Sequence, residues 1–274
     1  MVNDCSPNTE CEYQNLIQEF PELNIKYLKT ESNSGPGVAR QLGIDNCDCP
    51  WVLFHDDDDT LNNPYVIERY LEVIKQSENT RGILNAIYGL HQKEHGISGG
   101  FAGNIYNLNL IKLFNITFDP VLSFFEEDSH FLIRYQYYVY RLSEFYPCYL
   151  VDLETISDDI SITYTKKFNE YSICGILDND SRILKSLRYI NQVFKFYLEV
   201  PQDRILDDIF KRDLKNIFDY FYNLLKDCKQ SPKLSNEQKL LIEESCMRFG
   251  KIINDYPYVS ANKLQQYFDL IKSF

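Results

Sequence analysis

The sequence contains no run of about 20 consecutive apolar residues, the length that a membrane-spanning helix requires. Its first residues, Met1–Cys5, are largely polar and do not form the apolar core of a secretory signal peptide. Internal repeats and low-complexity tracts are missing as well. These absences predict a cytoplasmic protein without a membrane span.

Positive charge is in short supply, because 28 lysines and arginines stand against 40 aspartates and glutamates, for a formal net charge of −12. Such a balance argues against broad adhesion to nucleic acid or to an anionic membrane. The eight cysteines are scattered. Cys47 and Cys49 could share a soft metal, but no second pair or nearby histidine completes a zinc site, so we expect reduced, mostly buried thiols.

Apolar and aromatic residues are plentiful, at 44% and 15% of the 274 residues. This content excludes a disordered chain and suffices for one large domain, or one domain with an extension. We predict an α/β domain over residues 1–175 and a helical region over residues 176–274, where apolar residues recur at helical spacing. The helices expected there cover 182–200, 203–228, 236–254 and 261–274.

An acidic cluster directly follows a short apolar segment. Residues 51–54 (Trp-Val-Leu-Phe) predict a strand buried on both faces, and Asp56–Asp59 come just after it. Four neighbouring carboxylates repel one another unless they are solvated, protonated or bound to a cation. Hard oxygen ligands suit Mg²⁺ and Mn²⁺, and ligands of open α/β sheets collect beyond the carboxyl ends of strands. The cluster therefore predicts a metal and phosphate site, with a solvated acidic turn as the alternative.

Two other segments carry candidate site residues. The Gly35-Pro36-Gly37 turn should open a helix over about 37–46, which brings backbone N–H groups and Arg40 toward the ligand edge of the sheet. Residues 124–131 (Phe-Phe-Glu-Glu-Asp-Ser-His-Phe) place three acids at the start of another helix, where they either cap the helix or include a general base. Elsewhere we predict strands over 24–28, 82–90 and 147–153, a helix over 106–113 and a polar loop over 163–169.

Three motifs occur together, in order. Residues 33–43 (Asn-Ser-Gly-Pro-Gly-Val-Ala-Arg-Gln-Leu-Gly) resemble the Asn-x-Gly…Ala-Arg-Asn segment of family 2 glycosyltransferases of the GT-A fold. Residues 54–61 (Phe-His-Asp-Asp-Asp-Asp-Thr-Leu) resemble the family's Phe-Leu-Asp-x-Asp-Asp-x-Leu stretch, which contains its Asp-x-Asp motif. Residues 125–131 resemble its Glu-Asp motif, which supplies the catalytic base of inverting members. The resemblance implies a Rossmann-like, three-layer α/β domain with a mainly parallel sheet.

The same resemblance implies a nucleotide-sugar site. Asp4 would face the nucleotide base, and Arg40 would lie near the base or the diphosphate. Asp56 would contact the ribose, and Asp57 occupies the variable middle position of the motif. Asp58 would hold the divalent metal, Mn²⁺ or Mg²⁺, that bridges the diphosphate of the donor.

The implied reaction is an inverting, metal-assisted transfer of a sugar from a nucleotide-diphosphate sugar to an acceptor hydroxyl. Asp128, with Glu127 beside it, would deprotonate that hydroxyl. Lys166 or Lys167 would either help to hold the leaving diphosphate or lie solvated. The acceptor stays open: a polysaccharide, a lipid-linked glycan, a protein and a modified nucleic acid all remain candidates.

The resemblance departs from the family at the start of the chain. Residues 2–8 resemble the turn after the family's second strand, so the first strand, its turn and the first helix would precede Met1 and are absent from this sequence. Either the chain begins late, or another chain supplies the strand, or donor binding is altered. A non-catalytic or partner-dependent nucleotide-sugar-binding subunit is the main alternative function. A metal-dependent nucleotidyl or phosphoryl transferase is a weaker one, because no glycine-rich triphosphate loop with a lysine is present.

Overall fold

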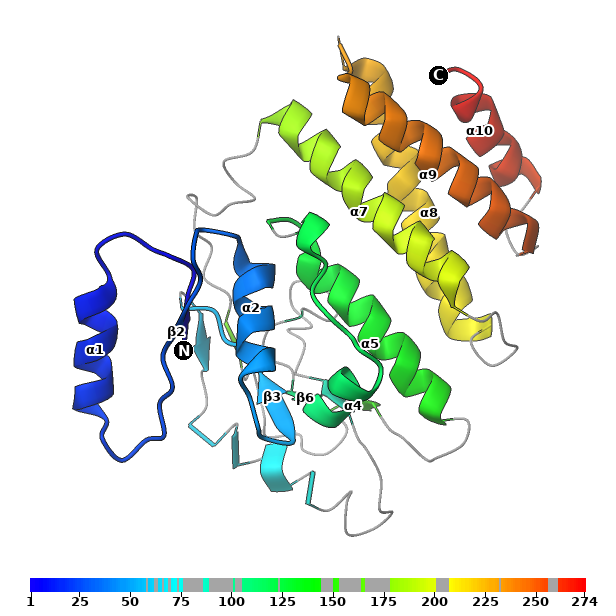
Figure 1. Cartoon of the computed structure of the whole chain (residues 1–274). Helices are drawn as coiled ribbons and strands as arrows, with labels where there is room; N and C mark the ends of the chain where they lie inside the picture. Colours follow the sequence, from blue (N-terminus) through cyan, green and yellow to red (C-terminus); the bar gives the residue numbers. More distant parts are fainter. Residues whose placement is uncertain are drawn as a thin grey trace. The chain divides into compact units, whose positions relative to one another are not determined.

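The chain folds into two compact units, Met1–Phe168 and Asn169–Phe274, and each is described by itself (Figure 1). The computed structural model describes residues 1–57, 59–61, 64–65, 67–68, 70–72, 74–75, 86–88, 101, 105–122, 124–143, 150–152, 164–165, 178–200, 207–231, 233–255 and 261–274. The domain boundary that the sequence predicts, between residues 175 and 176, lies outside the described residues.

The N-terminal unit mixes helices and strands. Its strands are β1 (Val2–Asn3), β2 (Leu28–Lys29), β3 (Trp51–Leu53), β4 (Thr60–Leu61), β5 (Ala86–Tyr88), β6 (Ile105–Asn107), β7 (Leu150–Asp152) and β8 (Tyr164–Thr165). Its helices are α1 (Glu10–Glu19), α2 (Pro36–Asp45), α4 (Leu108–Leu113) and α5 (Glu127–Ser143), with a 3₁₀ turn at Pro120–Leu122. The helix predicted over about 37–46 is therefore confirmed as α2.

The described strands form three sheets. β1 and β2 pair in parallel, β4 and β8 pair antiparallel, and four strands pair in the order β3-β6-β5-β7. Within the four-stranded sheet, β6 runs antiparallel to both of its neighbours, while β5 and β7 are parallel. In the described part of this sheet, β3, β5 and β7 thus run in one direction and β6 alone runs against them, so the sheet is mainly parallel, as predicted, with one antiparallel strand. Antiparallel strands in otherwise parallel α/β sheets are common.

Three sequence-based elements need correction. The predicted helix over 106–113 begins at Leu108, because the Asn107 side chain accepts hydrogen bonds from the N–H groups of Asn109 and Leu110 and ends strand β6 there. The predicted polar loop over 163–169 contains β8, which pairs with β4. The strand predicted over 24–28 is present as Leu28–Lys29, opposite Val2–Asn3.

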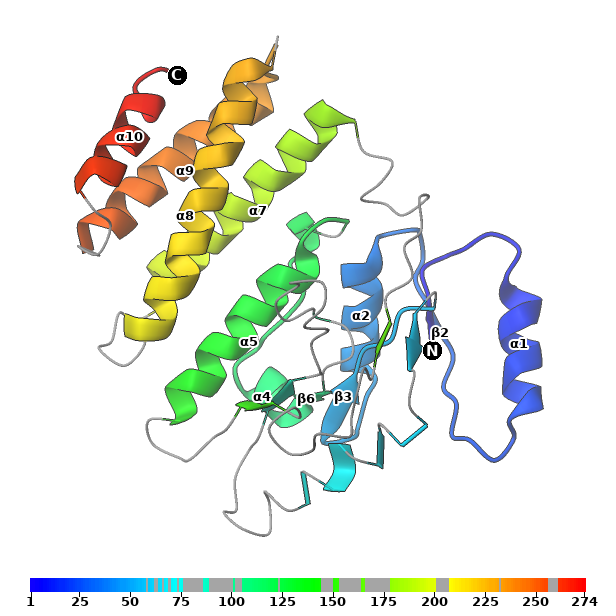
Figure 2. The same cartoon turned by 180° about the vertical axis from the view of Figure 1, so that it is seen from behind.

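Side chains cover both faces of β3, which confirms a layered arrangement around that strand. Val52 packs against a cluster that includes Ile44 of α2, Phe118, and Phe131 of α5. Trp51 and Leu53 pack instead against a second cluster with Tyr70, Ile74 and Ile105, from the opposite side. Figures 1 and 2 show α2 and α5 side by side over the first face. The strand that leads to the acidic cluster is therefore held between two layers of side chains.

Aromatic rings dominate the first of these clusters. Phe131 has no exposed surface and stacks on Phe118 with ring centroids 4.4 Å apart. Phe54, two residues before Asp56, makes a tilted contact with Phe101 at 4.8 Å and meets Phe131 edge-on. Such ring pairs contribute beyond their buried area. They fix the end of β3 relative to the start of α5, which are the two places where candidate site residues lie.

All described secondary-structure elements of the C-terminal unit are helices, as predicted. They are α7 (Asn179–Glu199), α8 (Asp207–Gln230), α9 (Asn236–Asp255) and α10 (Ala261–Ile271). Asp178 caps α7 by accepting a 2.7 Å hydrogen bond from the N–H of Ser181, which lowers the pKa of the Asp178 carboxyl. Buried rings fill the core of the bundle: Phe194, Phe218, Phe221, Phe249 and Tyr267. In the described part of the chain, we find no helix with the length and apolar character needed to cross a membrane.

Candidate active site

The turn before α2 is built around the carboxylate of Asp4. One carboxylate oxygen accepts hydrogen bonds from the N–H of Ser34 (3.0 Å) and the hydroxyl of Thr30 (2.8 Å), and the other accepts from the N–H of Gly35 (2.7 Å). Gly35 has φ = 90°, a conformation that glycine adopts without steric cost, and Pro36 then opens the helix. Asp4 therefore connects the end of β1 to the N-terminus of α2.

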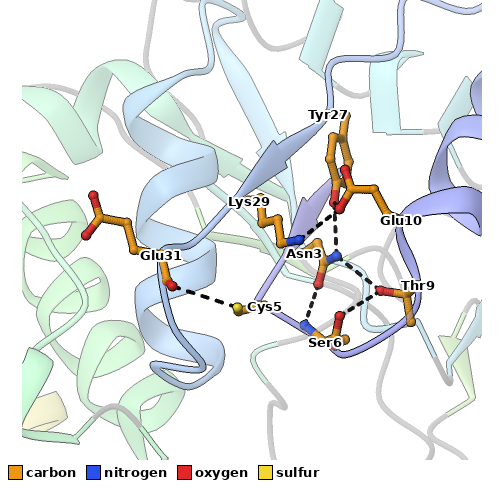
Figure 3. Close-up of polar contacts among 8 residues, drawn as sticks. All are labelled: Asn3, Cys5, Ser6, Thr9, Glu10, Tyr27, Lys29 and Glu31. Carbon is orange, nitrogen blue, oxygen red and sulfur yellow. Dashed lines mark hydrogen bonds and ion pairs between the residues drawn. The ribbon is translucent and has the colours of Figure 1, made fainter.

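A network of polar side chains holds the turn that carries Asp4. Figure 3 shows the Asn3 side chain between Thr9 and Tyr27; its amide nitrogen donates to the Thr9 hydroxyl (3.2 Å) and the Tyr27 hydroxyl (3.0 Å). The Asn3 side-chain oxygen accepts from the N–H of Ser6 at 2.8 Å. Asn3 is almost fully buried, and the chain turns beside it through Cys5 at φ = 58°. The position of Asp4 is thus fixed from both sides of the turn.

Arg40 joins the two acidic motifs. Its Nη2 donates to Asp56 Oδ1, beyond the end of β3, and its Nη1 donates to Glu127 Oε1, at the start of α5, both at 2.8 Å. The side chain of Arg40 is 14% exposed, that of Asp56 34% and that of Glu127 8%. The guanidinium carbon lies 5.0 Å from the centre of the Phe101 ring, which adds a cation–π contact on one side.

The charges around Arg40 outweigh the effect of its burial. Burial alone disfavours a charged guanidinium, but Asp56, Glu127 and Asp128 together hold the pKa of Arg40 above its ordinary value. Arg40 is therefore a permanent cation in a group that carries three carboxyl groups. One cation cannot neutralise three carboxylates, and the remaining negative charge has to be reduced in another way.

Protonation of Glu127 reduces part of this remaining negative charge. Burial and the charge of Asp128 raise the pKa of the Glu127 carboxyl to about 7, although Arg40 acts in the opposite direction. Asp128 is only half-buried, and its Oδ1 accepts a 2.7 Å hydrogen bond from the N–H of Ser129. The residue before the pair, Glu126, has φ = 58°, an uncommon conformation for a residue with a side chain. The two neighbouring acids therefore have different surroundings: one is buried against Arg40, and the other is more open to solvent.

A glycine allows α2 to approach α5 closely. A Cβ atom on Gly37 would lie 3.0 Å from Cγ and 3.3 Å from Cβ of Glu127. One turn further along α2, the side-chain oxygen of Gln41 accepts a 2.9 Å hydrogen bond from the N–H of Phe118. Gly37, Arg40 and Gln41 share one face of the helix by their spacing of three and four residues. This face holds the segment that carries Glu127 and Asp128.

The structure thus brings Arg40, Asp56, Glu127 and Asp128 together, and it places Asp4 at the N-terminus of the same helix α2. Asp57 lies exposed in the turn that follows Asp56. Asp58, Lys166 and Lys167 lie outside the described residues. Sequence reasoning did not identify Gly37, Gln41 and Phe101 as parts of the site. The spacing of Gly37, Arg40 and Gln41 on α2 was the signal available.

The described carboxylates fit a divalent cation only as partial ligands. Among the described residues, no group of three or more His, Cys, Asp or Glu side chains could hold a metal ion by itself. Mg²⁺ is commonly bound by one or two carboxylates together with phosphate oxygens of a ligand, and hard carboxylate oxygens of the acidic cluster match that chemistry. The donor set is therefore suited to an ion that arrives with a phosphate-bearing ligand.

Comparison with known proteins finds a family match in the N-terminal part of the chain. Residues 1–109 match the family model described as glycosyl transferase family 2. This part of the chain, less than half of the 274 residues, is therefore similar to that family, and the match includes two of the three motifs, residues 33–43 and 54–61. The match includes Asp4, Arg40 and the acidic cluster, whereas Glu127 and Asp128 lie beyond its end.

Individual relatives align with a shorter part of this chain than the family model does. An uncharacterized glycosyltransferase of Haemophilus influenzae is 30% identical over 88 residues, which are 32% of this chain and 26% of that protein. A teichoic acid poly(glycerol phosphate) polymerase of Staphylococcus epidermidis is also 30% identical over 88 residues, which are 32% of this chain and 12% of that protein. The matched stretch thus spans about a quarter or less of these curated relatives.

A solved structure confirms the fold class. The crystal structure of residues 1–349 of S. aureus TarS superposes with a TM-score of 0.51 at 17% sequence identity. The likeness covers 82% of this chain and 68% of that one. The predicted α/β architecture of the GT-A type with a helical C-terminal region is therefore confirmed.

The close approach at Gly37 gives a test of the site's packing. We expect Gly37→Ala to destabilise the protein by about 1–3 kcal/mol, because Glu127 is held by Arg40 and cannot move aside without loss of that bond. Gly43→Ala, in the same helix, is the control. Its Cβ would meet only Val2 Cγ2 at an ordinary 3.5 Å, so this variant should be neutral or more stable by up to about 1 kcal/mol. Chemical denaturation measures both, and equal stabilities would contradict the packing described.

Proposed function

We propose that this chain is an inverting glycosyltransferase, which transfers a sugar from a nucleotide-diphosphate sugar to a hydroxyl of an acceptor. The observation that carries the proposal is the buried guanidinium of Arg40 between Asp56 and Glu127, with Asp128 beside it. The family match of residues 1–109 supports the donor class. Polysaccharides, lipid-linked glycans, proteins and modified nucleic acids are the acceptor classes to be tested.

The donor side of this proposal uses the segments around α2. Asp4 faces the nucleotide base, and Arg40, Asp56 and Asp57 line the side of the nucleotide and its ribose. Asp58 holds Mn²⁺ or Mg²⁺. When bound, the ion neutralises charge that develops on the diphosphate as it leaves. The excess of carboxylates over cations in the described site favours such a bound cation.

The acceptor side depends on Asp128. Its carboxylate takes the proton of the acceptor hydroxyl, and the hydroxyl oxygen bonds to the anomeric carbon. The bond from that carbon to the diphosphate oxygen breaks in the same step, and its electron pair leaves with the diphosphate. Glu127 is less suited to meet the acceptor, because it is buried and its carboxylate is bound to Arg40.

The metal assignment is tested by ligand-dependent melting. With Mn²⁺, a nucleoside diphosphate at about 100 times its Kd should stabilise the parent protein by roughly 2.7 kcal/mol. Asp58→Ala should abolish the part of this stabilisation that depends on Mn²⁺. Asp48→Ala, an exposed carboxylate before β3, is the matched control and should behave as the parent. Equal metal-dependent shifts for Asp58→Ala and the parent would refute the assignment.

The base is tested by a substitution that keeps its shape. Asp128→Asn should lower the rate of sugar transfer by about 10²–10⁴-fold while donor affinity stays nearly unchanged. If Asp128 only caps α5, asparagine would cap almost as well, and both rate and stability would survive. Asp119→Asn is the control, because Asp119 caps the 3₁₀ turn by accepting from the N–H of Val121. Loss of donor binding in Asp128→Asn would place this residue in the donor site instead.

We also propose that a strand from another polypeptide segment pairs with the edge of β1 that faces away from β2. In the described structure β1 pairs with β2 alone, and α1 has no buried residue. The side chains of Leu16 in α1 and of Phe20, directly after the helix, are each 38% exposed. Unpaired edges and exposed apolar faces favour a covering segment.

If a further strand pairs with β1, donor affinity and amide exchange should change when the chain is extended upstream or produced together with a partner. Production of the protein from an upstream-extended reading frame, or together with the product of the neighbouring gene, should raise donor affinity. It should also slow amide hydrogen exchange at Val2, whose N–H belongs to the free edge of β1. Unchanged affinity and unchanged exchange in both preparations would contradict the proposal.

A further inference from the structure

We propose that Arg40 is a positioning residue for the reaction: it holds Glu127 from α2 and thereby sets the place and the charge of the Glu127–Asp128 pair. This inference rests on the proposed function, since it concerns the group that would serve as the base. In this role Arg40 acts through Glu127 and does not touch the reacting atoms. The positioning role is additional to the nucleotide contact that the proposed function gives to the same arginine.

The geometry of the guanidinium supports this role. Each of its two terminal nitrogens donates to a carboxylate of the protein, Nη2 to Asp56 and Nη1 to Glu127. The planar fork of arginine can satisfy two carboxylates in fixed directions, which the single ammonium of lysine cannot do equally well. Phe101 lies against the guanidinium and limits its movement. The guanidinium of Arg40 is thus held by three contacts within the protein.

The position of Asp128 follows from that of Glu127. Both residues belong to the first turn of α5, so an anchor on Glu127 restrains its neighbour through the helix backbone. Gly37 lets the Glu127 side chain pack directly on α2, and Gln41 binds the backbone of Phe118 from the same helix face. Of these three residues of α2, Arg40 carries the charge, and it supplies both a direction and a charge to Glu127.

The charge effect follows from the groups that face Glu127. These are Arg40 from α2, Asp128 on α5 and, on the far side of the guanidinium, Asp56 beyond β3. Without Arg40 no cation in this set would oppose burial and the negative charge of Asp128. Glu127 would then keep its proton to a higher pH. The bond to Arg40 thus decides at which pH the pair gains its second negative charge.

The charge part of the proposal can be measured without turnover. In the folded parent the pKa of Glu127 is about 7, above its ordinary 4.5, so the folded state binds more protons than the unfolded state between these values. Glu127 therefore contributes a loss of stability as pH rises from about 4.5 to about 7. Arg40→Gln should extend this decline upward by about 1 pH unit or more, which is the usual effect of one adjacent opposite charge.

Four proteins separate this effect from general damage: the parent, Arg40→Gln, Glu127→Gln and the double variant. Their stability is measured by denaturation from pH 5 to 9. Glu127→Gln and the double variant should both lack the decline that belongs to Glu127. If the decline in Arg40→Gln ends at the same pH as in the parent, the charge part of the proposal is wrong.

The positioning part is measured by transfer rates. Arg40→Lys keeps the charge but not the fork, so we expect its kcat to fall by about 10–100-fold, with little change in the pH at which activity rises. Arg40→Gln should lose at least as much and should also shift the acidic limb of the pH–rate profile upward. Equal kcat for Arg40→Lys and the parent would overturn the positioning part. Arg40→Lys also serves as the second variant if Arg40→Gln does not fold.

Arg134→Gln is the matched control. Arg134 lies on α5 and donates to the backbone oxygens of Thr117 (2.8 Å) and Asn115 (3.1 Å), so its loss disturbs packing without a change at Glu127. The acidic limb of the pH–rate profile of Arg134→Gln should match that of the parent. If the parent transfers no sugar from any donor, the proposed function fails, yet the stability profiles still decide whether Arg40 controls the charge of Glu127.

Discussion

One guanidinium makes the acidic centre of the N-terminal unit possible. Asp56 and Glu127 come from segments far apart in the sequence, and both are at least half-buried beside a third carboxyl group, Asp128. A buried carboxylate without a partner is strongly destabilising, because desolvation is not compensated. Arg40 supplies that compensation to two of the three, and the raised pKa of Glu127 relieves the remaining excess. The placement of α2, α5 and the end of β3 relative to one another depends on this arrangement.

Close packing between α2, α5 and the end of β3 keeps Arg40 and its carboxylate partners together. Gly37 removes the side chain that would separate α2 from Glu127, and the aromatic cluster around Phe131 joins the end of β3 to α5. Just before Gly37, at the N-terminal end of the same helix, Asp4 fixes the turn that starts α2. One helix therefore connects the segment proposed for the nucleotide base with the segment proposed for the catalytic base. A shift of α2 would therefore displace both of these segments.

The sequence predicts this structure where the signals are local. The four C-terminal helices follow from apolar periodicity, and the start of α2 follows from its glycine-proline-glycine turn, whose chemistry acts over a few residues. The helix expected from Tyr106 begins only at Leu108, because pairing with β3 holds Tyr106 and Asn107 in a strand. The motifs indicated that Arg40, Asp56 and Glu127 belong to one site. The bond between Arg40 and Glu127 spans 87 residues, and no local pattern specifies such a partner.

The proposed reaction is a single displacement at the anomeric carbon, assisted by a carboxylate that removes a proton from the attacking oxygen. Its most direct test is the anomeric configuration of the sugar released or transferred from an α-linked nucleotide-sugar donor, read by proton NMR at early times. Water can serve as the acceptor, so the natural acceptor need not be known. A single displacement predicts the β-anomer as the first product. The α-anomer as the first product would contradict the mechanism.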